Sequence, residues 1–291
     1  MSLHPQYARP RSAAQAVELL RGLGSGAVVI AGGQELMPHI NYGRLMPSVL
    51  VDISALPDLM GIQDVDGVLS IGALTVLREL KKNSLVKTSL PLLSRAASLV
   101  GGGWQVHNRG TLGGNIVAMH PLYDIIPPLL VLDAEVEILS AGEVRRAPLA
   151  AVISETSLGL GQRALITRIF LRATPPGFGW AYEKLKITEG AYGSANAAAV
   201  VAMHGGKVSA ARLVIGAVSE RPIDGGAAVE SLLGRPFDDH IAQEFEAACA
   251  ALVTQPMNDQ QGNSRWRRAM AGVIARRAIS VAVSRASAQQ I

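Results

Sequence analysis

Cysteine is nearly absent: one residue, Cys249, stands among 291. A single thiol excludes an internal disulfide, a CxxC redox pair and an iron–sulfur cluster held by four cysteines of this chain. Cys249 lies in the helix-like pattern AQEFEAACAALV, which predicts a buried, unreactive thiol. If the chain moves electrons, an organic cofactor must carry them within it.

Long apolar runs are also missing. No uninterrupted run reaches the roughly 20 residues that cross a bilayer, and the first 20 residues lack an apolar signal core followed by a small-residue cleavage site. We therefore expect a cytoplasmic protein without a membrane span. A composition of 49% hydrophobic and 17% charged residues is typical of a compact fold, and 291 residues allow two domains.

Aromatic residues make up only 4% of the chain, which weakens a nucleic-acid interpretation of the net charge of +4. Much of the positive excess lies in one C-terminal segment, where basic residues alternate with Ala, Val and Ile: Arg265, Arg267, Arg268, Arg276, Arg277 and Arg285. A basic stripe without interleaved aromatics is poor evidence for nucleic acid. We expect a solvated helix face, better suited to an acidic partner protein than to a nucleic acid.

Glycine, in contrast, is plentiful and clustered. The apolar strand at residues 28–30 runs into Ala31-Gly32-Gly33, and a helix-compatible segment opens at Gln34. Glycines let the backbone approach a ligand closely, and a helix start offers N–H groups to an anion. Alone, such a turn is more often only a turn. A second glycine-rich segment at residues 108–115, NRGTLGGN, indicates that two loops grip the two phosphates of a dinucleotide.

The common phosphate-binding motifs do not occur. The first turn lacks GxGxxG, Asp52 lies inside its own strand, and no GxxxxGK[ST] segment is present. A dinucleotide would thus be held in a non-Rossmann way, mainly by backbone N–H groups of the two loops. His39, His107 and His120 lack metal-ligand spacing, so we expect structural or hydrogen-bonding roles and no metal site.

Apolar periodicity and turn residues predict the elements of the chain. Helices are expected at residues 12–23, 75–82 (with Thr75 as N-cap), 90–100, 129–132, 226–233, 241–252 and 265–285. Strands are expected at residues 28–30, 48–53, 67–73, 135–139, 143–146, 165–171, 180–187, 196–204 and 208–218, the last two joined by a Gly205-Gly206 hairpin turn. Gly101-Gly102-Gly103 is predicted to be a mobile link, and Tyr123 to Pro128 to break regular structure. The Pro/Gly cluster at residues 174–179 is the best domain boundary.

Four segments then resemble, in order, a known family. They are AGGQELMPHI, VDIS, LSIGALTVLREL and NRGTLGGNIVAMHPLYDIIPPLLVLDAEVEI. The series resembles the FAD-binding (medium) subunit of the molybdenum hydroxylases, among them carbon monoxide dehydrogenase and xanthine dehydrogenase. The second half, from Tyr182-Glu183-Lys184-Leu185 onward, is similar to the C-terminal domain of that family. The resemblance spans nearly the whole chain.

The resemblance implies an α+β fold in two domains. An FAD-binding domain of the PCMH type is expected over residues 1–175, with subdomains at about 1–57 and 58–175. A C-terminal domain of a three-stranded antiparallel sheet plus a helical layer is expected over residues 176–291.

The resemblance also implies a set of cofactor-binding residues and no catalytic residue, because the chemistry is redox at the flavin. The implied set is Ala31, Gly32, Gly33, Gln34, Glu35, Leu36, Thr75, Thr111, Gly113, Gly114, Asn115, Asp124, Lys184 and Tyr192. Asp124 would approach the ribityl and flavin portion and Tyr192 the isoalloxazine ring. By themselves, Asp124 also suits a helix cap, Thr75 an N-cap and Tyr192 a core position.

Three positions depart from the family pattern. Gln34 stands where Thr or His is common, Ile187-Thr188-Glu189 replaces a short basic run, and His120 replaces a small residue. His120 can therefore face the flavin pocket, and partner docking or the flavin edge can differ from that of the relatives.

As function, the resemblance implies one subunit of a heteromeric hydroxylase. A molybdopterin-binding large subunit and a [2Fe–2S] small subunit would be its partners, in a dimer of heterotrimers. The FAD here would pass electrons from the clusters to an external acceptor. Two alternatives stay open: a stand-alone FAD-dependent reductase, for which no substrate-reducing acid motif is evident, and a flavin-free scaffold subunit.

Overall fold

The computed structural model describes residues 5–154 and 163–289, which form two compact units. Unit 1 comprises Met1–Leu80, Trp104–Ala118 and Asp133–Ala173; unit 2 comprises Lys81–Gly103, Met119–Leu132 and Thr174–Ile291. Residues 81–103 and 119–132, which the sequence analysis grouped with the N-terminal domain, thus pack with the C-terminal half of the chain.

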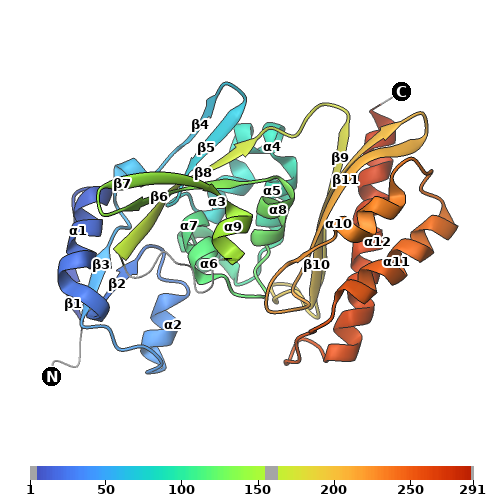
Figure 1. The fold of residues 1–291 in the computed structure, drawn as a ribbon. Helices are drawn as coiled ribbons and strands as arrows, with labels where there is room; N and C mark the ends of the chain where they lie inside the picture. The colour runs from blue at the N-terminus through green and yellow to red at the C-terminus, as the bar shows by residue number, and fades with distance from the viewer. Residues whose placement is uncertain (1–4, 155–162, 290–291) are drawn as a thin grey trace. The chain divides into compact units, whose positions relative to one another are not determined.

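Unit 1 begins with a small parallel sheet of strand order β1-β3-β2 (Figure 1). Its elements are β1 (Gln6–Ala8), α1 (Ala13–Leu23), β2 (Ala27–Ile30), α2 (Leu36–Asn41) and β3 (Val49–Asp52). Helix α1 begins where predicted because the Ser12 side chain accepts a hydrogen bond from the Gln15 N–H. The expected βαβ arrangement is confirmed, with α2 beginning at Leu36 after the glycine turn.

A five-stranded antiparallel sheet completes unit 1, in the order β4-β5-β8-β6-β7. The strands are β4 (Ile62–Val65), β5 (Val68–Gly72), β6 (Glu135–Ser140), β7 (Glu143–Pro148) and β8 (Ala164–Arg172), and helix α9 (Leu149–Ser154) follows β7. One apolar core joins the two sheets, since Leu165 of β8 packs with Val49 and Val51 of β3 and with Leu20 of α1.

The second glycine-rich segment of unit 1 is largely helical, which the sequence analysis missed. Helix α6 (Gly103–Arg109) and helix α7 (Leu112–Ala118) are separated only by Gly110 and Thr111. The Thr111 hydroxyl accepts a hydrogen bond from the Gly114 N–H and so caps α7. This cap and the burial of Leu112 and Ile116 on one helix face outweigh the poor helix propensity of two glycines.

Thr75 does not cap a helix, contrary to expectation. Helix α3 (Leu77–Lys82) begins two residues later. Val76 pairs with Thr111 as an isolated bridge, and the carbonyl of Thr75 accepts from the Leu112 N–H at 2.9 Å. The Val76 carbonyl accepts the N–H groups of Glu79 and Leu80 at 2.9 and 3.2 Å, so Val76 and not Thr75 precedes the first turn of α3.

Unit 2 is built on an antiparallel sheet of order β12-β11-β10-β9. Its three long strands, which were predicted, are β9 (Phe178–Leu185), β10 (Ala195–His204) and β11 (Lys207–Gly216); the sequence analysis did not count the short β12 (Ile223–Asp224). Gly205 and Gly206 both have positive φ in the tight turn between β10 and β11, as a two-residue hairpin requires.

Helices cover both faces of this sheet, whereas a single helical layer was predicted. One face packs against α10 (Gly226–Val229), α11 (Asp239–Leu252) and α12 (Ser264–Ala288), and the other against α5 (Pro91–Leu99) and α8 (Ile126–Val131) (Figure 1). A short helix, α4 (Ser84–Ser89), precedes α5. Burial on both faces explains why nearly every residue of β10 is apolar and buried.

One expectation for unit 2 is wrong. Pro127 and Pro128 do not break regular structure but form the first turn of α8, where a missing N–H costs nothing. The mobility predicted for Gly101-Gly102-Gly103 stays a prediction; the Gly102 N–H donates to the Gly190 carbonyl at 3.0 Å.

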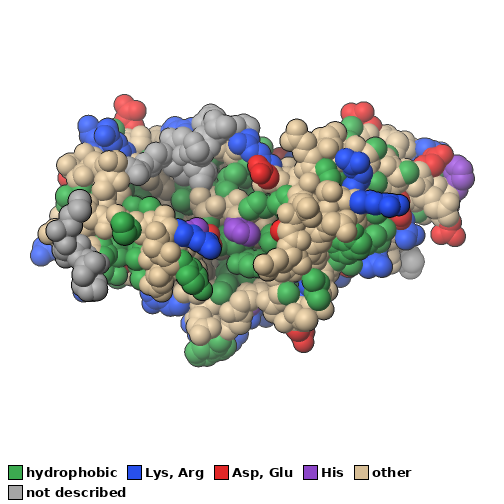
Figure 2. Space-filling view, turned by 90° about the horizontal axis from the view of Figure 1, so that it is seen from below, with side chains coloured by type: hydrophobic (Ala, Val, Ile, Leu, Met, Phe, Trp, Pro, Cys, Tyr) green, Lys and Arg blue, Asp and Glu red, His purple; other side chains and the backbone are tan. Residues whose placement is uncertain are grey.

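The prediction of a solvated helix face holds for four of the six arginines, which are exposed, but not for the whole stripe: the exposed ones are Arg265, Arg268, Arg277 and Arg285. Arg267 is fully buried, and its guanidinium donates to the carbonyls of Ser194 and Ala217 and to the Asp259 carboxylate. Arg276 pairs with Glu246 of α11, and Arg285 lies over the Trp180 ring. On the face drawn in Figure 2, basic side chains are spread among apolar and uncharged ones and form no single patch. Much of this positive charge therefore binds unit 2 together.

The lone cysteine matches its prediction. Cys249 is buried in the α11 side of the unit 2 core, and burial raises the pKa of its thiol to about 12. Within the described ranges, none of the helices combines the length and the apolar character needed to cross a bilayer.

Candidate functional site

The first glycine turn of unit 1 lies directly against the end of α6. A Cβ atom on Gly32 would fall 1.9 Å from the carbonyl oxygen of Arg109, so no side chain fits at this position. Gly33 has φ +72°, a conformation that L side chains rarely adopt. The two segments that the sequence predicted to act together are therefore in backbone contact.

A third segment joins them through main-chain hydrogen bonds. The Gly113 N–H donates to the Ala73 carbonyl at 2.8 Å, and the Leu77 N–H donates to the Gly110 carbonyl at 3.0 Å. A Cβ atom on Gly113 would lie 2.8 Å from that of Ala73. We call these three segments, residues 31–35, 73–76 and 109–115, the glycine cluster.

The hydrogen bonds in the glycine cluster change the expected role of its second loop. The N–H groups of Leu112, Gly113, Gly114 and Asn115 all donate to protein acceptors. The expectation that a ligand is held mainly by backbone N–H groups finds no support in these four. Gly113 instead permits close packing against Ala73. The groups that suit a polar ligand are therefore the side chains and the first glycine turn.

In and beside the glycine cluster, two buried polar atoms have no hydrogen-bond partner among the described residues. They are the Thr75 hydroxyl oxygen and the side-chain oxygen of Asn108. An unsatisfied buried polar group costs about 1–3 kcal/mol. Both atoms therefore suit a bound polar molecule that completes their hydrogen bonds.

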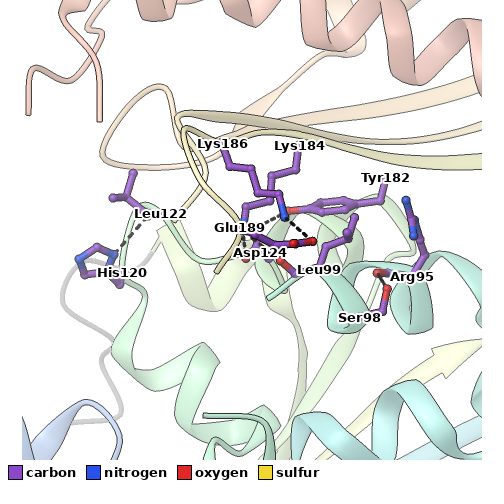
Figure 3. A network of polar contacts seen from close by, with 10 residues as sticks. All are labelled: Arg95, Ser98, Leu99, His120, Leu122, Asp124, Tyr182, Lys184, Lys186 and Glu189. Atoms are coloured by element: carbon purple, nitrogen blue, oxygen red, sulfur yellow. Dashed lines mark hydrogen bonds and ion pairs between the residues drawn. The ribbon is translucent and has the colours of Figure 1, made fainter. Parts of the chain in front are cut away.

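In unit 2, Asp124 is the centre of a buried polar network (Figure 3). Its carboxylate accepts from the Tyr182 hydroxyl at 2.7 Å and from the Lys184 ammonium at 2.8 Å. The side chains of Asp124 and Lys184 are each only 2% exposed. Lys184 also donates to the Leu99 carbonyl at 3.1 Å, so the network ties β9 to the end of α5.

Burial dominates the electrostatics of this network. It raises the pKa of Asp124, and the positive charge of Lys184 offsets part of that rise. Burial and the neighbouring Asp124 raise the pKa of Tyr182 well above its ordinary value, so Tyr182 stays a neutral donor. The alternative in which Asp124 caps a helix is wrong, because Ile125 occupies the N-cap position of α8.

Three rings gather beside this network. The His120 ring stacks on that of Tyr192 with centroids 5.4 Å apart and planes at 20°, and lies 5.2 Å from the ring of Tyr123. Tyr192 is 45% exposed, so the alternative that places it in the core is wrong.

The structure thus brings the predicted cofactor-binding residues together as two groups, one in each unit. Unit 1 holds Ala31, Gly32, Gly33, Gln34, Glu35, Leu36, Thr75, Thr111, Gly113, Gly114 and Asn115, and unit 2 holds Asp124, Lys184 and Tyr192. Sequence reasoning missed Asn108, Tyr123 and Tyr182. Tyr182 could have been found, because it lies two residues before Lys184 and so shares its face of β9.

No group of three or more His, Cys, Asp or Glu side chains that could hold a metal ion occurs among the described residues. The side chains that the two groups bring together are polar and aromatic, and such side chains suit a bound organic molecule.

Comparison with known proteins identifies that molecule. Residues 3–172 match the model of the FAD binding domain in molybdopterin dehydrogenase, and residues 180–282 match that of the CO dehydrogenase flavoprotein C-terminal domain. The chain belongs to the molybdopterin dehydrogenase flavoproteins. The resemblance and the α+β fold class expected from the sequence are confirmed, and this flavoprotein is a subunit of an oxidoreductase.

Individual relatives agree over nearly their whole length. The flavoprotein is 35% identical to the carbon monoxide dehydrogenase medium chain of Afipia carboxidovorans over 284 residues, covering 96% of this chain and 97% of that one. It is 31% identical to the 6-hydroxypseudooxynicotine dehydrogenase complex subunit alpha of Paenarthrobacter nicotinovorans, covering 96% and 95%. A solved carbon monoxide dehydrogenase from Hydrogenophaga pseudoflava superposes with a TM-score of 0.92 at 34% identity, covering 97% and 98%.

The residues present fit FAD. Gly32 brings bare backbone to the place where the two glycine-rich segments meet, and the Thr75 hydroxyl is a buried hydrogen-bonding group of the same cluster without a partner among the described residues. A flavin dinucleotide offers a diphosphate and several polar groups to such an environment.

Proposed function

We propose that this chain is the FAD-carrying electron-transfer subunit of a heteromeric molybdenum-containing hydroxylase or dehydrogenase. It takes electrons from the [2Fe–2S] clusters of a small subunit, alongside a molybdopterin-binding large subunit, and passes them to an external acceptor. The complex is a dimer of heterotrimers. The names of the relatives, "medium chain" and "complex subunit alpha", support membership of a multi-subunit enzyme.

The contact between Gly32 and Arg109 is the observation that carries this proposal. It brings the first glycine turn against the second glycine-rich segment, as two-sided recognition of one diphosphate requires. Gly32 and Gly33 form the bare part of the cradle, and the side chains of Gln34, Thr111 and Asn115 supply its polar part. Thr75 completes the set with its buried hydroxyl.

Bound FAD supplies a carrier that exchanges electrons with clusters and with organic acceptors. The chain binds and orients it. In unit 2, the positive charge of Lys184 is balanced by the negative charge of Asp124, with Nζ and Oδ2 2.8 Å apart. This pair can therefore lie near a flavin without adding net charge. Tyr182 keeps its proton because its pKa is raised well above the ordinary value.

Recognition of the substrate does not belong to this subunit in our proposal. Relatives of similar identity carry names that refer to carbon monoxide and to 6-hydroxypseudooxynicotine. One fold of the flavin subunit thus serves different oxidations, and we assign substrate recognition to the partner chain.

Flavin content tests the proposal. The purified wild-type chain should show flavin absorption and release one FAD per chain on acid treatment. Gly32→Ala should lose FAD because its methyl group collides with the Arg109 carbonyl. Gly22→Ala is the matched control, since a Cβ at this helical glycine of the same unit meets nothing within 4 Å. A Gly32→Ala chain fully loaded with FAD would contradict the cradle.

A second variant guards against a folding defect. Thr75→Val keeps the shape of the side chain and removes the unpartnered hydroxyl. The flavin-free variant should be as stable as wild type in urea, while its FAD affinity should fall about tenfold for one lost hydrogen bond. Molybdenum and iron that copurify with the chain distinguish the subunit from a stand-alone reductase, and a colourless wild-type chain would indicate a scaffold.

A further inference from the structure

The segment around His120 has an unusually constrained backbone. Met119, immediately before it, has φ 41°, which is rare for a residue with a side chain. Pro121 follows, and the Tyr123 N–H donates to the His120 carbonyl at 3.0 Å, so residues 120–123 form a β-turn with proline at its second position. Left-handed residues outside glycine tend to occur at functional sites.

The His120 side chain is fixed as well. Its Nδ1 atom accepts the Leu122 N–H at 3.2 Å, which sets the orientation of the ring (Figure 3). The turn places Tyr123 on the same side, and the two rings lie 5.2 Å apart. Asp124, the next residue, is held by Tyr182 and Lys184. The turn is therefore constrained internally and anchored at its C-terminal end.

The segment that carries Tyr192 is anchored independently. It links β9 to β10 and is closed at its base by the Ser194 N–H, which donates to the Leu185 carbonyl at 2.8 Å. Near its tip, Gly190 packs on Gly101, where a Cβ would lie 2.2 Å from the Gly190 carbonyl oxygen. The stack of Tyr192 on His120 thus joins two separately held segments of unit 2.

We propose that His120, supported by Tyr123, is a positioning residue that holds the Tyr192 ring in the orientation in which it meets the isoalloxazine ring of FAD. This inference rests on the proposed function and goes beyond it, because it assigns a role to a side chain that departs from the family pattern. The His120–Tyr192 stack and the constrained turn, anchored at Asp124, carry it.

Stacked ring pairs contribute enough energy for the effect to be measured. Beyond its buried area, a stacked ring pair changes an affinity by roughly two- to twelvefold. Loss of the His120 ring should release Tyr192 and weaken FAD binding about fivefold. The circular dichroism of bound flavin in the visible region should change too, because it depends on the rings packed against the isoalloxazine.

Two substitutions separate the ring from the turn. His120→Phe keeps the ring but loses the acceptor for the Leu122 N–H, whereas His120→Asn keeps an acceptor for that N–H and loses the ring. FAD titration of the full chain, followed by flavin fluorescence, should give nearly wild-type affinity and dichroism for His120→Phe and the fivefold loss for His120→Asn. The reverse order would show a purely structural turn residue and overturn the proposal.

A double-mutant cycle shows whether His120 acts through Tyr192. In a Tyr192→Ala background, His120→Asn should cause no further loss of FAD affinity. An equal loss in both backgrounds, or unchanged FAD binding in Tyr192→Ala alone, would overturn the proposal while leaving the flavin assignment intact. A wild-type chain that fails to bind FAD would instead refute the proposed function itself.

Discussion

The Asp124–Lys184 pair is the residue-scale feature with the largest energetic consequence. Two charges with side chains 2% exposed compensate each other at 2.8 Å. Removing one partner leaves the other buried and unpaired, which is far more costly than removing both. The effects of substituting Asp124 and Lys184 should therefore be strongly coupled.

Lys184→Met should lower the free energy of unfolding by about 3–5 kcal/mol. The double variant Asp124→Asn with Lys184→Met should lose much less than the sum of the single changes, because neither charge remains. Urea unfolding of wild type, Asp124→Asn, Lys184→Met and the double variant measures the coupling free energy between the two residues. Additive losses would show that the pair is not coupled.

The pH dependence of Lys184→Met follows from the same contact. Burial raises the pKa of Asp124 in the folded state, and loss of Lys184 removes the charge that lowers it. A folded pKa above the unfolded value means that stability is lost as the pH rises through the folded pKa. The variant should therefore be less destabilised at pH 5 than at pH 8, relative to wild type.

Cys249 gives a second prediction at this scale. Its pKa is raised by burial from 9.0 to about 12, so its contribution to stability is complete below pH 9 and declines between pH 9 and pH 12. By pH 10.5 the loss should reach about 2 kcal/mol. The free energy of unfolding in urea should fall more steeply with pH for wild type than for Cys249→Ala. The two proteins share all other titrating groups.

At the scale of elements, α12 is more than the last helix of unit 2. Its Arg267 donates to the carbonyls of Ser194, at the start of β10, and of Ala217, just after β11. The helix therefore fixes the loop ends of the sheet as well as covering its face.

Arg267→Met should lower the free energy of unfolding by about 3 kcal/mol, because two buried carbonyl groups lose their donor. Arg277→Met is the matched control on the exposed side of the same helix and should stay within about 0.5 kcal/mol of wild type. Urea unfolding compares them. Equal stability of both variants would mean that the buried guanidinium contributes no net stability.

Sequence patterns predicted most elements, because apolar periodicity and caps act locally. Ser12 marked the start of α1, and Gly205-Gly206 marked the hairpin. The patterns failed where contacts between residues far apart in the sequence determine the structure. Proline at residues 127–128 looked like a break because the residues that bury α8 come from β10 and β11. Arg267 looked like a surface residue because its acceptors lie 50 and 73 positions away.

At the scale of the whole molecule, the candidate cofactor residues divide between the two units. The motif residues of unit 1 were predictable because glycine and threonine spacing is visible in one stretch. The partners of Asp124 and the ring stack on His120 were not, since they join residues 58 to 72 positions apart.

Hydrogen exchange tests the complete set of candidate cofactor-binding residues. Adding FAD should slow amide exchange at residues 31–36 and 111–115 of unit 1 and also at residues 120–124 and 188–193 of unit 2, because bound ligand stabilises the segments it contacts. Protection confined to unit 1 would contradict the assignment of Asp124, Lys184 and Tyr192.

One close approach in unit 2 has a mechanical consequence. A Cβ on Gly179 would lie 1.8 Å from the Ala282 carbonyl oxygen, so the main chains of β9 and α12 touch with nothing between them. A side chain at residue 179 would therefore force the strand and the helix apart. Since β9 leads directly into the segment that carries Tyr192, that segment starts from a closely packed strand. We expect adjustment to an arriving flavin to be concentrated in residues 186–194.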